Sequence, residues 1–492
     1  ILGALSSLSL PPLNFFLVNF LSLTIFYIFL FKKLDTHINK KVFFFYGWSF
    51  GFGYFLTNLY WLTISLTFDE NFNFLIPLAL FLIPAFLAVF YGFGTFIFGI
   101  LNIKNVVSSF FLFSLIFGLT EFIRGNILTG FPWNLIVYSL SEKLNFIAFL
   151  SIIGTYSLNL LVISFFSAPA LFILRKSKRE IIVLIFLVLT PIMIFLYGSF
   201  YKNKFLSNEL ESNPILIRVI GSNISLDRFY INIDAEKVIN ELIELSSPDK
   251  NKKILFLWPE GIIPVADQNE FKLYKDLFTR NFNENHLIGL GITNKMSKNG
   301  KDEYFNSFSV FDNHLNLIEN YNKINLVPFG EFLPFENFLN KIGLKTITRN
   351  VGSFSKGEYR NIIKVQNDLN EFKFLPLICY EIIYSGELTK NFNFNFIANI
   401  SEDGWFGKSI GPKQHFVHSI YRAIEIGKYV VRSANNGMTA VINPLGEIER
   451  KIDYGKGGFV DFDKRRVQDS TFFSKYGNKI FGLLILLYIF LI

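Results

Sequence analysis

The stretch LICYE at residues 377–381 closes a short apolar run and contains Cys379, the single cysteine of the chain. Two comparable stretches precede it: LWPEG at residues 257–261, with Glu260, and YNKINLVPFGE at residues 321–331, with Lys323 and Glu331. Each stands at the end of a predicted strand, and strand ends are where α/β folds build their sites. The separations (323 − 260 = 63 and 379 − 323 = 56) exclude one local motif, so the fold must bring the stretches together.

The composition places much of the rest of the chain in lipid. Of its 492 residues, 51% are hydrophobic and only 17% charged, and the mean hydropathy is +0.37. These values are too apolar for an ordinary soluble protein. One cysteine excludes an internal disulfide framework and a multi-cysteine metal site. We expect no metal and no cofactor. The chain begins with Ile1 instead of Met, and we expect its start to be trimmed or incomplete.

Several apolar runs have the length of about 17 to 25 residues that crossing a bilayer requires. They are apolar on all sides, as in a membrane bundle, and predict about eight helices, the first of them truncated. The expected helical segments are 1–9, 13–31, 43–65, 74–100, 106–123, 145–174, 181–200 and 475–492.

Basic residues predict the orientation of this bundle. Loop 32–42 contains four lysines and loop 175–180 four basic residues, and such loops face the cytoplasm. We therefore interpret the net charge of +8 as a topology signal and expect no nucleic-acid partner. Strict alternation then places the region after residue 204 outside the cytoplasm, and the last apolar run returns inside.

Residues 205–470 have a different pattern, in which short apolar runs alternate with polar stretches. This pattern predicts a soluble α/β domain with strands near residues 215–217, 254–257, 287–291, 374–378 and 396–398, and helices at 235–245 and 416–430. We thus expect three parts: N-terminal transmembrane helices (1–204), an extracytoplasmic catalytic domain (205–470) and a C-terminal transmembrane helix (471–492).

A strand-end glutamate, a central lysine and a later cysteine resemble the Glu-Lys-Cys triad of the nitrilase superfamily, which implies an α-β-β-α sandwich. The flanking residues narrow the resemblance to the apolipoprotein N-acyltransferases. It covers nearly the whole chain and differs at Ser401-Glu402 and at Ser225-Leu226. The matching stretches are PP at 11–12, EFIR at 121–124, TGFPWN at 129–134, LVPFGE at 326–331, CYE at 379–381, DGWFG at 403–407, Arg422-Ala423 with Glu425, and Arg432 with Asn435 and Gly437.

The chemistry of such a triad follows from its three groups. A thiol must lose its proton to attack an ester carbonyl, a carboxylate can take that proton, and a fixed cation stabilises the oxyanion. Cys379 is then the nucleophile, Glu260 the general base and later acid, and Lys323 the oxyanion stabiliser. Taken singly, Cys379 is more simply a small buried apolar residue, Lys323 a surface lysine and Glu260 a helix cap.

Three further residues owe their expected roles to the resemblance. It implies that Glu331 supports the triad, by orienting Lys323, and that Tyr380 and Glu381 shape the site. A solvated turn residue is the plainer interpretation of Glu331. Trp405 and Phe406 are equally compatible with packing and with contact to acyl chains.

Other polar residues leave alternatives open. His415 and His418 are three residues apart but have no neighbouring carboxylate or cysteine in the sequence, so they predict no metal site. Glu121 and Arg124 either anchor a helix at the interface or contact a lipid head group. The apolar stretches 332–335 and 338–339 are expected to dip into the interface and to exclude water from a thioester.

The resemblance implies a bacterial inner-membrane enzyme with its catalytic domain on the periplasmic side. It would transfer a fatty acyl group from a membrane phospholipid, through a cysteine thioester, to the N-terminal diacylglyceryl-cysteine of an apolipoprotein. We expect a monomer with membrane lipids as further partners. Two alternatives remain: a membrane-anchored amidase that uses water as acceptor, and a transporter with an external binding domain, which the scarcity of ionisable residues in the apolar runs disfavours.

Overall fold

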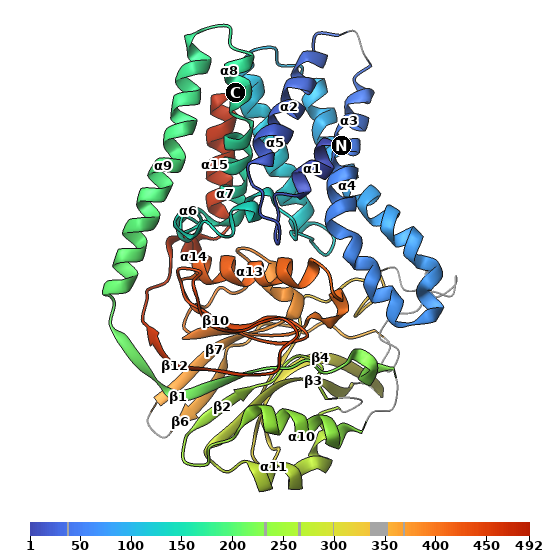
Figure 1. The fold of residues 1–492 in the computed structure, drawn as a ribbon, viewed down its shortest axis with the longest axis vertical. Helices are drawn as coiled ribbons and strands as arrows, with labels where there is room; N and C mark the ends of the chain where they lie inside the picture. The colour runs from blue at the N-terminus through green and yellow to red at the C-terminus, as the bar shows by residue number, and fades with distance from the viewer. Residues whose placement is uncertain (37–38, 231–233, 264–266, 299, 335–352, 368–369) are drawn as a thin grey trace.

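A helical bundle lies on one side of a two-sheet unit in the computed structural model (Figure 1). The structure describes residues 1–36, 39–230, 234–263, 267–298, 300–334, 353–367 and 370–492. The bundle contains α1 (Leu2–Ser7), α2 (Val18–Lys33), α3 (Lys41–Leu59), α4 (Ile76–Leu101), α5 (Val106–Asn126), α6 (Leu144–Ile147), α7 (Leu150–Ser167), α8 (Pro169–Ile173), α9 (Lys178–Ser207), α14 (Phe472–Tyr476) and α15 (Lys479–Leu491).

Among the described residues, four helical segments are long and apolar enough to cross a membrane: 70–101, 106–126, 150–173 and 178–207. A shorter apolar helix, α15, ends the chain. The basic loops between α2 and α3 and between α8 and α9 both lie at the end of the bundle that faces away from the sheets (Figure 1). One end of the bundle is therefore basic, as the distribution of lysine and arginine in the sequence predicts.

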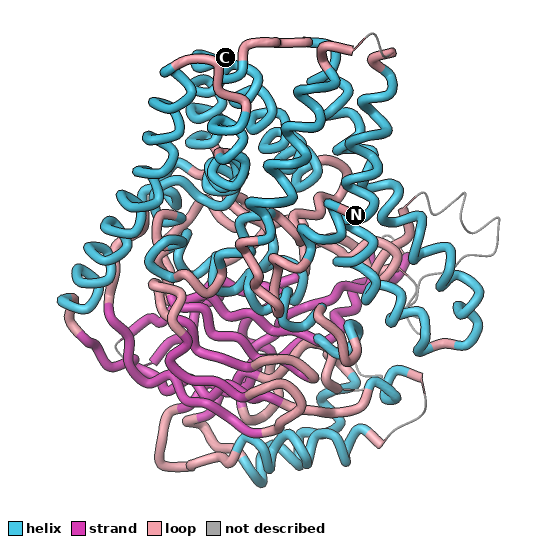
Figure 2. Tube along the Cα trace, turned by 45° about the horizontal axis from the view of Figure 1, so that its top comes forward, coloured by secondary structure: helices cyan, strands magenta, loops and turns pink. Residues whose placement is uncertain are grey.

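Two six-stranded sheets stack face to face beneath the bundle (Figure 2). The first has the order β12 (Gly458–Arg466), β1 (Leu210–Gly221), β2 (Ile254–Leu257), β3 (His286–Lys298), β4 (Lys301–Asp312), β5 (Leu317–Asn322). The second has the order β11 (Ile448–Ile452), β10 (Thr439–Ile442), β9 (Tyr429–Asn435), β8 (Phe396–Glu402), β7 (Asn370–Ile378), β6 (Ile363–Asn367).

Helices cover both outer faces of this sheet pair. Helices α10 (Ala235–Ser246) and α11 (Lys275–Asn281) cover the first sheet, and α13 (Gly411–Ile426) lies between the second sheet and the bundle (Figure 1). Strand β2 shows how the sequence produces the layers, because successive side chains of a strand point to opposite faces. Leu255 and Leu257 pack between the sheets, whereas Ile254 and Phe256 pack against the helices. The α-β-β-α sandwich is thus confirmed.

The bundle and the second sheet share one hydrophobic core. It contains bundle residues such as Phe113 and Tyr156, and it continues through Tyr421 of α13 to Leu377 of β7. The two parts therefore pack against each other through an apolar, close-packed contact. Burial of this kind stabilises by about 25 cal/mol per Å² of apolar surface, which favours one fixed arrangement of the bundle over the sheets.

Local backbone conformations divide some expected elements. The segment 145–174 contains three helices, and its longest, α7, has Gly154 at φ +75°. The expected helix 416–430 ends earlier, at Ile426, because Gly427 adopts a left-handed φ of +71° that terminates it. Tyr429 then begins β9.

Candidate active site

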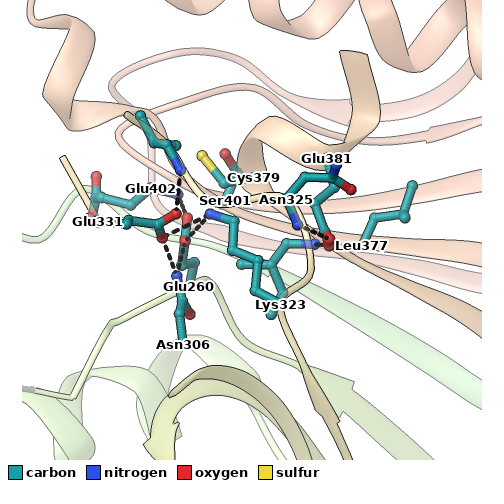
Figure 3. Close-up of polar contacts among 12 residues, drawn as sticks. Glu260, Asn306, Lys323, Asn325, Glu331, Leu377, Cys379, Glu381, Ser401 and Glu402 are labelled. Carbon is teal, nitrogen blue, oxygen red and sulfur yellow. Dashed lines mark hydrogen bonds and ion pairs between the residues drawn. The ribbon is translucent and has the colours of Figure 1, made fainter. Parts of the chain in front are cut away.

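The three strand-end stretches meet between the sheets (Figure 3). Glu260 follows β2 and Lys323 follows β5, both in the first sheet, whereas Cys379 follows β7 in the second. All three side chains are nearly buried, with residue exposures of 7%, 1% and 8%. The residues predicted to act together are thus brought into one site, although they come from different strands and both sheets.

Glu260 accepts hydrogen bonds through both carboxylate oxygens. Its Oε1 receives Asn306 Nδ2 at 2.8 Å and Lys323 Nζ at 3.4 Å, and its Oε2 receives the backbone N–H of Glu402 at 3.0 Å. Gly291 of β3 passes directly behind it, where a Cβ atom would lie 2.5 Å from the Glu260 Cα. A glycine is required at that position for the strand to approach the carboxylate-bearing turn.

Lys323 lies between two carboxylates. Its Nζ is 2.8 Å from Glu331 Oε1 and 3.4 Å from Glu260 Oε1. Burial alone would lower the pKa of Lys323, but the Glu331 and Glu260 carboxylates raise it above its ordinary value. The ammonium is therefore charged at neutral pH and held in a fixed place.

Glu331 is not a solvated turn residue. It is 8% exposed, and its Oε1 accepts from both Lys323 Nζ and Asn306 Nδ2, the latter at 2.6 Å. Its Oε2 accepts the backbone N–H of Val327 at 2.8 Å, which closes the turn that follows Lys323. This geometry supports the predicted orienting role.

Cys379 occupies a strained turn at the end of β7. Its φ is +47°, a left-handed conformation that is uncommon for a residue with a Cβ atom, and a short 3₁₀ turn begins there. The sulfur points to the same side as the Lys323 amine in Figure 3. Burial and then the Glu260 carboxylate raise the pKa of the thiol well above its ordinary value, against the opposing effect of Lys323. Cys379 is therefore a thiol at neutral pH, and a base would have to take its proton before the sulfur could act as a nucleophile.

This protonation state predicts how Cys379 reacts with a small alkylating reagent. Because a raised thiol pKa leaves the thiolate fraction small and growing with pH, the alkylation rate should rise about tenfold per pH unit from pH 6 to 9 without levelling. Mass spectrometry of the Cys379 peptide after timed exposure to iodoacetamide measures this rate. A rate that is already level at pH 7 would instead indicate a preformed thiolate.

Glu381 does not face the reacting groups but ties the nucleophile turn to the lysine turn. Its Oε2 accepts the backbone N–H of Ile378, while its Oε1 accepts Tyr321 Oη at 2.6 Å, Arg360 Nη2 at 2.6 Å and two backbone N–H groups of the lysine turn. Burial would raise the pKa of this carboxyl, but Arg360 and the hydrogen bonds lower it, so it stays ionised. Glu381 thereby holds together the two turns that contain Cys379 and Lys323.

Tyr380 points away from the sheets toward the bundle. Its hydroxyl donates to the carbonyl of Gly130 at 2.9 Å, and Tyr384 Oη donates to the carbonyl of Thr129 at 2.8 Å. The loop after α5 therefore contacts the residues that follow the nucleophile.

Several contributors were not predicted from the sequence. Asn306 bridges Glu260 and Glu331, Glu402 positions Glu260 through its backbone, and Arg360 neutralises Glu381. None of them stands beside a triad residue in the chain. Arg360 had no local signal, whereas Asn306, in a strand beside β5, becomes recognisable only once strand pairing is known.

The remaining residues noted in the sequence are placed as follows. Phe406 packs against Trp61, Trp133 and His415, and Trp405 stacks on Phe229. Glu121 and Arg124 form a buried ion pair with each other and do not lie on an exposed surface. The described residues hold no group of three or more His, Cys, Asp or Glu arranged for a metal. Phe335, Phe338 and Leu339 lie outside the described residues.

The comparison with known families first gives the class of protein to which the two-sheet unit belongs. Residues 225–460 match the carbon-nitrogen hydrolase model, the nitrilase-type fold of the two sheets. A solved variant of the Nesterenkonia AN1 amidase from the nitrilase superfamily covers 51% of this chain and 91% of its own, with 11% identity and a TM-score of 0.37.

The matches that include the helical bundle identify the family within that class. Residues 2–168 match the apolipoprotein N-acyltransferase N-terminal domain. Apolipoprotein N-acyltransferases from Agrobacterium fabrum and Rhizobium leguminosarum bv. trifolii are 32% and 33% identical to this chain, over 93% of it and 88% of each relative. The chain therefore belongs to the apolipoprotein N-acyltransferase family, which confirms the resemblance seen in its motifs.

Proposed function

We propose that the protein transfers a fatty acyl group from a membrane phospholipid, through a thioester on Cys379, to the α-amino group of the N-terminal diacylglyceryl-cysteine of apolipoproteins. The observation that carries the proposal is the buried arrangement of Cys379, Lys323 and Glu260 next to an apolar bundle. The names of the relatives support lipoprotein N-acylation as the overall activity.

In the first half-reaction, Glu260 takes the thiol proton as Cys379 Sγ attacks the ester carbonyl of the phospholipid. The Lys323 ammonium stabilises the negative charge that forms on the carbonyl oxygen, because it is fixed and already desolvated. Collapse of this intermediate breaks the carbon-oxygen bond, and Glu260 returns the proton to the departing lysophospholipid alcohol. An acyl thioester remains on Cys379.

In the second half-reaction, the free α-amino group of the lipoprotein attacks the thioester carbonyl. Glu260 takes a proton from the amine, the carbon-sulfur bond breaks, and an amide forms while Cys379 regains its proton. Lys323 stabilises the second oxyanion as it did the first. The formation of an amide from a thioester is thermodynamically favourable. The two half-reactions therefore need no cofactor and no external energy source.

The surroundings of the site support lipid-embedded substrates. We propose membrane helices at 1–204 and 471–492 and a catalytic domain at 205–470 that lies on the periplasmic side of a bacterial inner membrane. The basic end of the bundle faces away from the sheets, which supports that orientation under the positive-inside rule. Both substrates would then reach the site by lateral diffusion in the outer leaflet.

Mass spectrometry of the full-length protein after incubation with phospholipid alone tests the first half-reaction. We expect a fatty-acyl mass on the Cys379 peptide that hydroxylamine removes, because thioesters are cleaved by this reagent whereas amides resist it. Adding a diacylglyceryl peptide with a free N-terminus should discharge the acyl group to that amine.

In the matched control, the same protein is incubated with a diacylglyceryl peptide whose N-terminus is acetylated. This peptide has no free amine, so the acyl group should stay on Cys379. If protein with intact activity never carries the acyl mass, the phospholipid donor is wrong. Release of free fatty acid at the same rate with either peptide would favour the amidase alternative, in which water is the acceptor.

A further inference from the structure

His415 of α13 contacts the backbone of the turn that contains Cys379. It is fully buried, and its Nε2 is 3.2 Å from the backbone carbonyl oxygen of Cys379. Asn399 Nδ2 approaches the same oxygen only at 3.5 Å. The imidazole therefore provides the closer side-chain hydrogen bond to the backbone of the nucleophile.

A charged pair fixes the other side of the imidazole. His415 Nδ1 is 2.9 Å from Asp403 Oδ1, and Arg432 Nη2 is 2.8 Å from Asp403 Oδ2 and 3.1 Å from the same Nδ1. Burial would raise the pKa of Asp403, but Arg432 and His415 hold it well below its usual range. The carboxylate is thus ionised, and it accepts a hydrogen bond from Nδ1 when that nitrogen is protonated; when it is not, Arg432 connects the carboxylate to the ring.

Two aromatic rings pack against the imidazole of His415. Trp133, from the loop after α5, stacks on it with ring centroids 5.3 Å apart and planes 20° apart, and Phe406 meets it edge-on at 5.4 Å. The ring can therefore neither flip nor slide without disturbing its neighbours. Its orientation is set jointly by the bundle and by the sheet unit.

The chemistry of the acceptor decides which atom carries the hydrogen. A carbonyl oxygen only accepts, so Nε2 must carry hydrogen to bond Cys379, whether the imidazole is neutral or charged. Arg432 can donate to an unprotonated Nδ1, while a protonated Nδ1 donates to Asp403. Both states leave the bond to Cys379 intact.

We propose that His415 is a positioning residue for the nucleophile, acting through this bond on the backbone of Cys379. The left-handed conformation of Cys379 is disfavoured for a residue with a Cβ atom, so it persists only where its surroundings fix it. By holding the carbonyl, His415 keeps the Cα–Cβ bond aimed toward Lys323 and Glu260. The inference rests on the proposed function for its effect on acyl transfer.

Two variants test this role, because each keeps an amide nitrogen at the position of only one of the two ring nitrogens. In His415→Gln the side-chain amide reaches the Nε2 position and can still donate to Cys379, whereas in His415→Asn it reaches only the Nδ1 position beside Asp403. Because displacing a reacting atom by about 1 Å can cost 10²-fold in rate, we expect His415→Asn to slow thioester formation about 30- to 100-fold. We expect His415→Gln to stay within about threefold of the natural chain, and both to leave KM for phospholipid unchanged.

Equal losses in the two variants would overturn the proposal, because they would indicate that the ring is needed for packing alone; full activity in both would overturn it as well. Thermal unfolding of each variant in detergent separates folding from positioning. Alkylation of Cys379 by iodoacetamide gives a readout that needs no acyl donor, and it should be slower in His415→Asn than in His415→Gln. This difference in alkylation rate would persist even if the natural chain never formed an acyl thioester. A failure of the positioning role of His415 can therefore be distinguished from a failure of the proposed acyl transfer.

Discussion

Replacing Cys379 with alanine is expected to abolish acyl transfer, with a loss of at least about 10⁴-fold in rate. The proposed reaction is covalent, so without the sulfur there is no thioester, and the remaining groups can only polarise the ester. Transfer of radiolabelled acyl chains to a diacylglyceryl peptide, with a detection limit below 0.01% of the natural rate, measures the loss.

Serine at position 379 is the matched control. It preserves size and hydrogen bonding, but its hydroxyl is a far weaker nucleophile, so we expect it to be nearly as inactive as alanine. Because Cys379 makes up little of the core, both variants should unfold within about 1 °C or 2 °C of the natural chain. More than 1% residual transfer in the alanine variant would show that another residue forms the covalent intermediate.

Replacing Lys323 with methionine is expected to reduce acyl transfer strongly and to destabilise the fold. The cation is buried between the carboxylates of Glu331 and Glu260, and both also share one donor, Asn306. Without Lys323, two like charges lie side by side with their common counter-ion gone, which costs about 3–5 kcal/mol. Loss of oxyanion stabilisation should reduce acyl transfer by about 10²- to 10³-fold.

A double variant separates these two effects. Adding Glu331→Gln to Lys323→Met removes one of the two facing charges, so it should recover at least half of the lost stability while acyl transfer stays about 10²- to 10³-fold below that of the natural chain. Thermal midpoints in detergent, which should fall by about 10 °C in the single variant, and acyl-transfer rates measure the two quantities. Recovery of activity together with stability would show that Lys323 acts only in folding.

The strand ends and the triad were predictable from the sequence because each rests on a local pattern. Apolar runs mark β2 and the end of β7, which Glu260 and Cys379 follow. Strand β5, which precedes Lys323, has the mostly polar sequence LIENYN, so Lys323 was found from its flanking motif and not from an apolar run. The long apolar runs predicted the membrane helices for the same reason. Their interruptions, such as the one at Gly154, depend on what packs beside them and left no clear local signal.

The supporting residues were harder to predict because their partners are distant in the chain. His415 and His418 stood out only as a possible metal pair, yet the carboxylate that His415 meets, Asp403, lies twelve residues away and Arg432 comes from another strand. Tyr380 was expected to shape the site, but its partner is a carbonyl 250 residues earlier. Contacts of this kind follow from the packing of the two halves and not from either segment.

The pairing of the first strand of the sheets with the last has a consequence for biogenesis. Strand β1, at residues 210–221, lies between β2 and β12, so the sheet acquires its outer strand only when residues 458–466 have been synthesised. The ribosome has by then made the described strands of both sheets, and α15 begins just after, at Lys479. Closure of the sheet and membrane insertion of α15 are therefore nearly simultaneous events, and a nascent chain truncated before residue 458 retains an unpaired edge that chaperones or proteases can recognise.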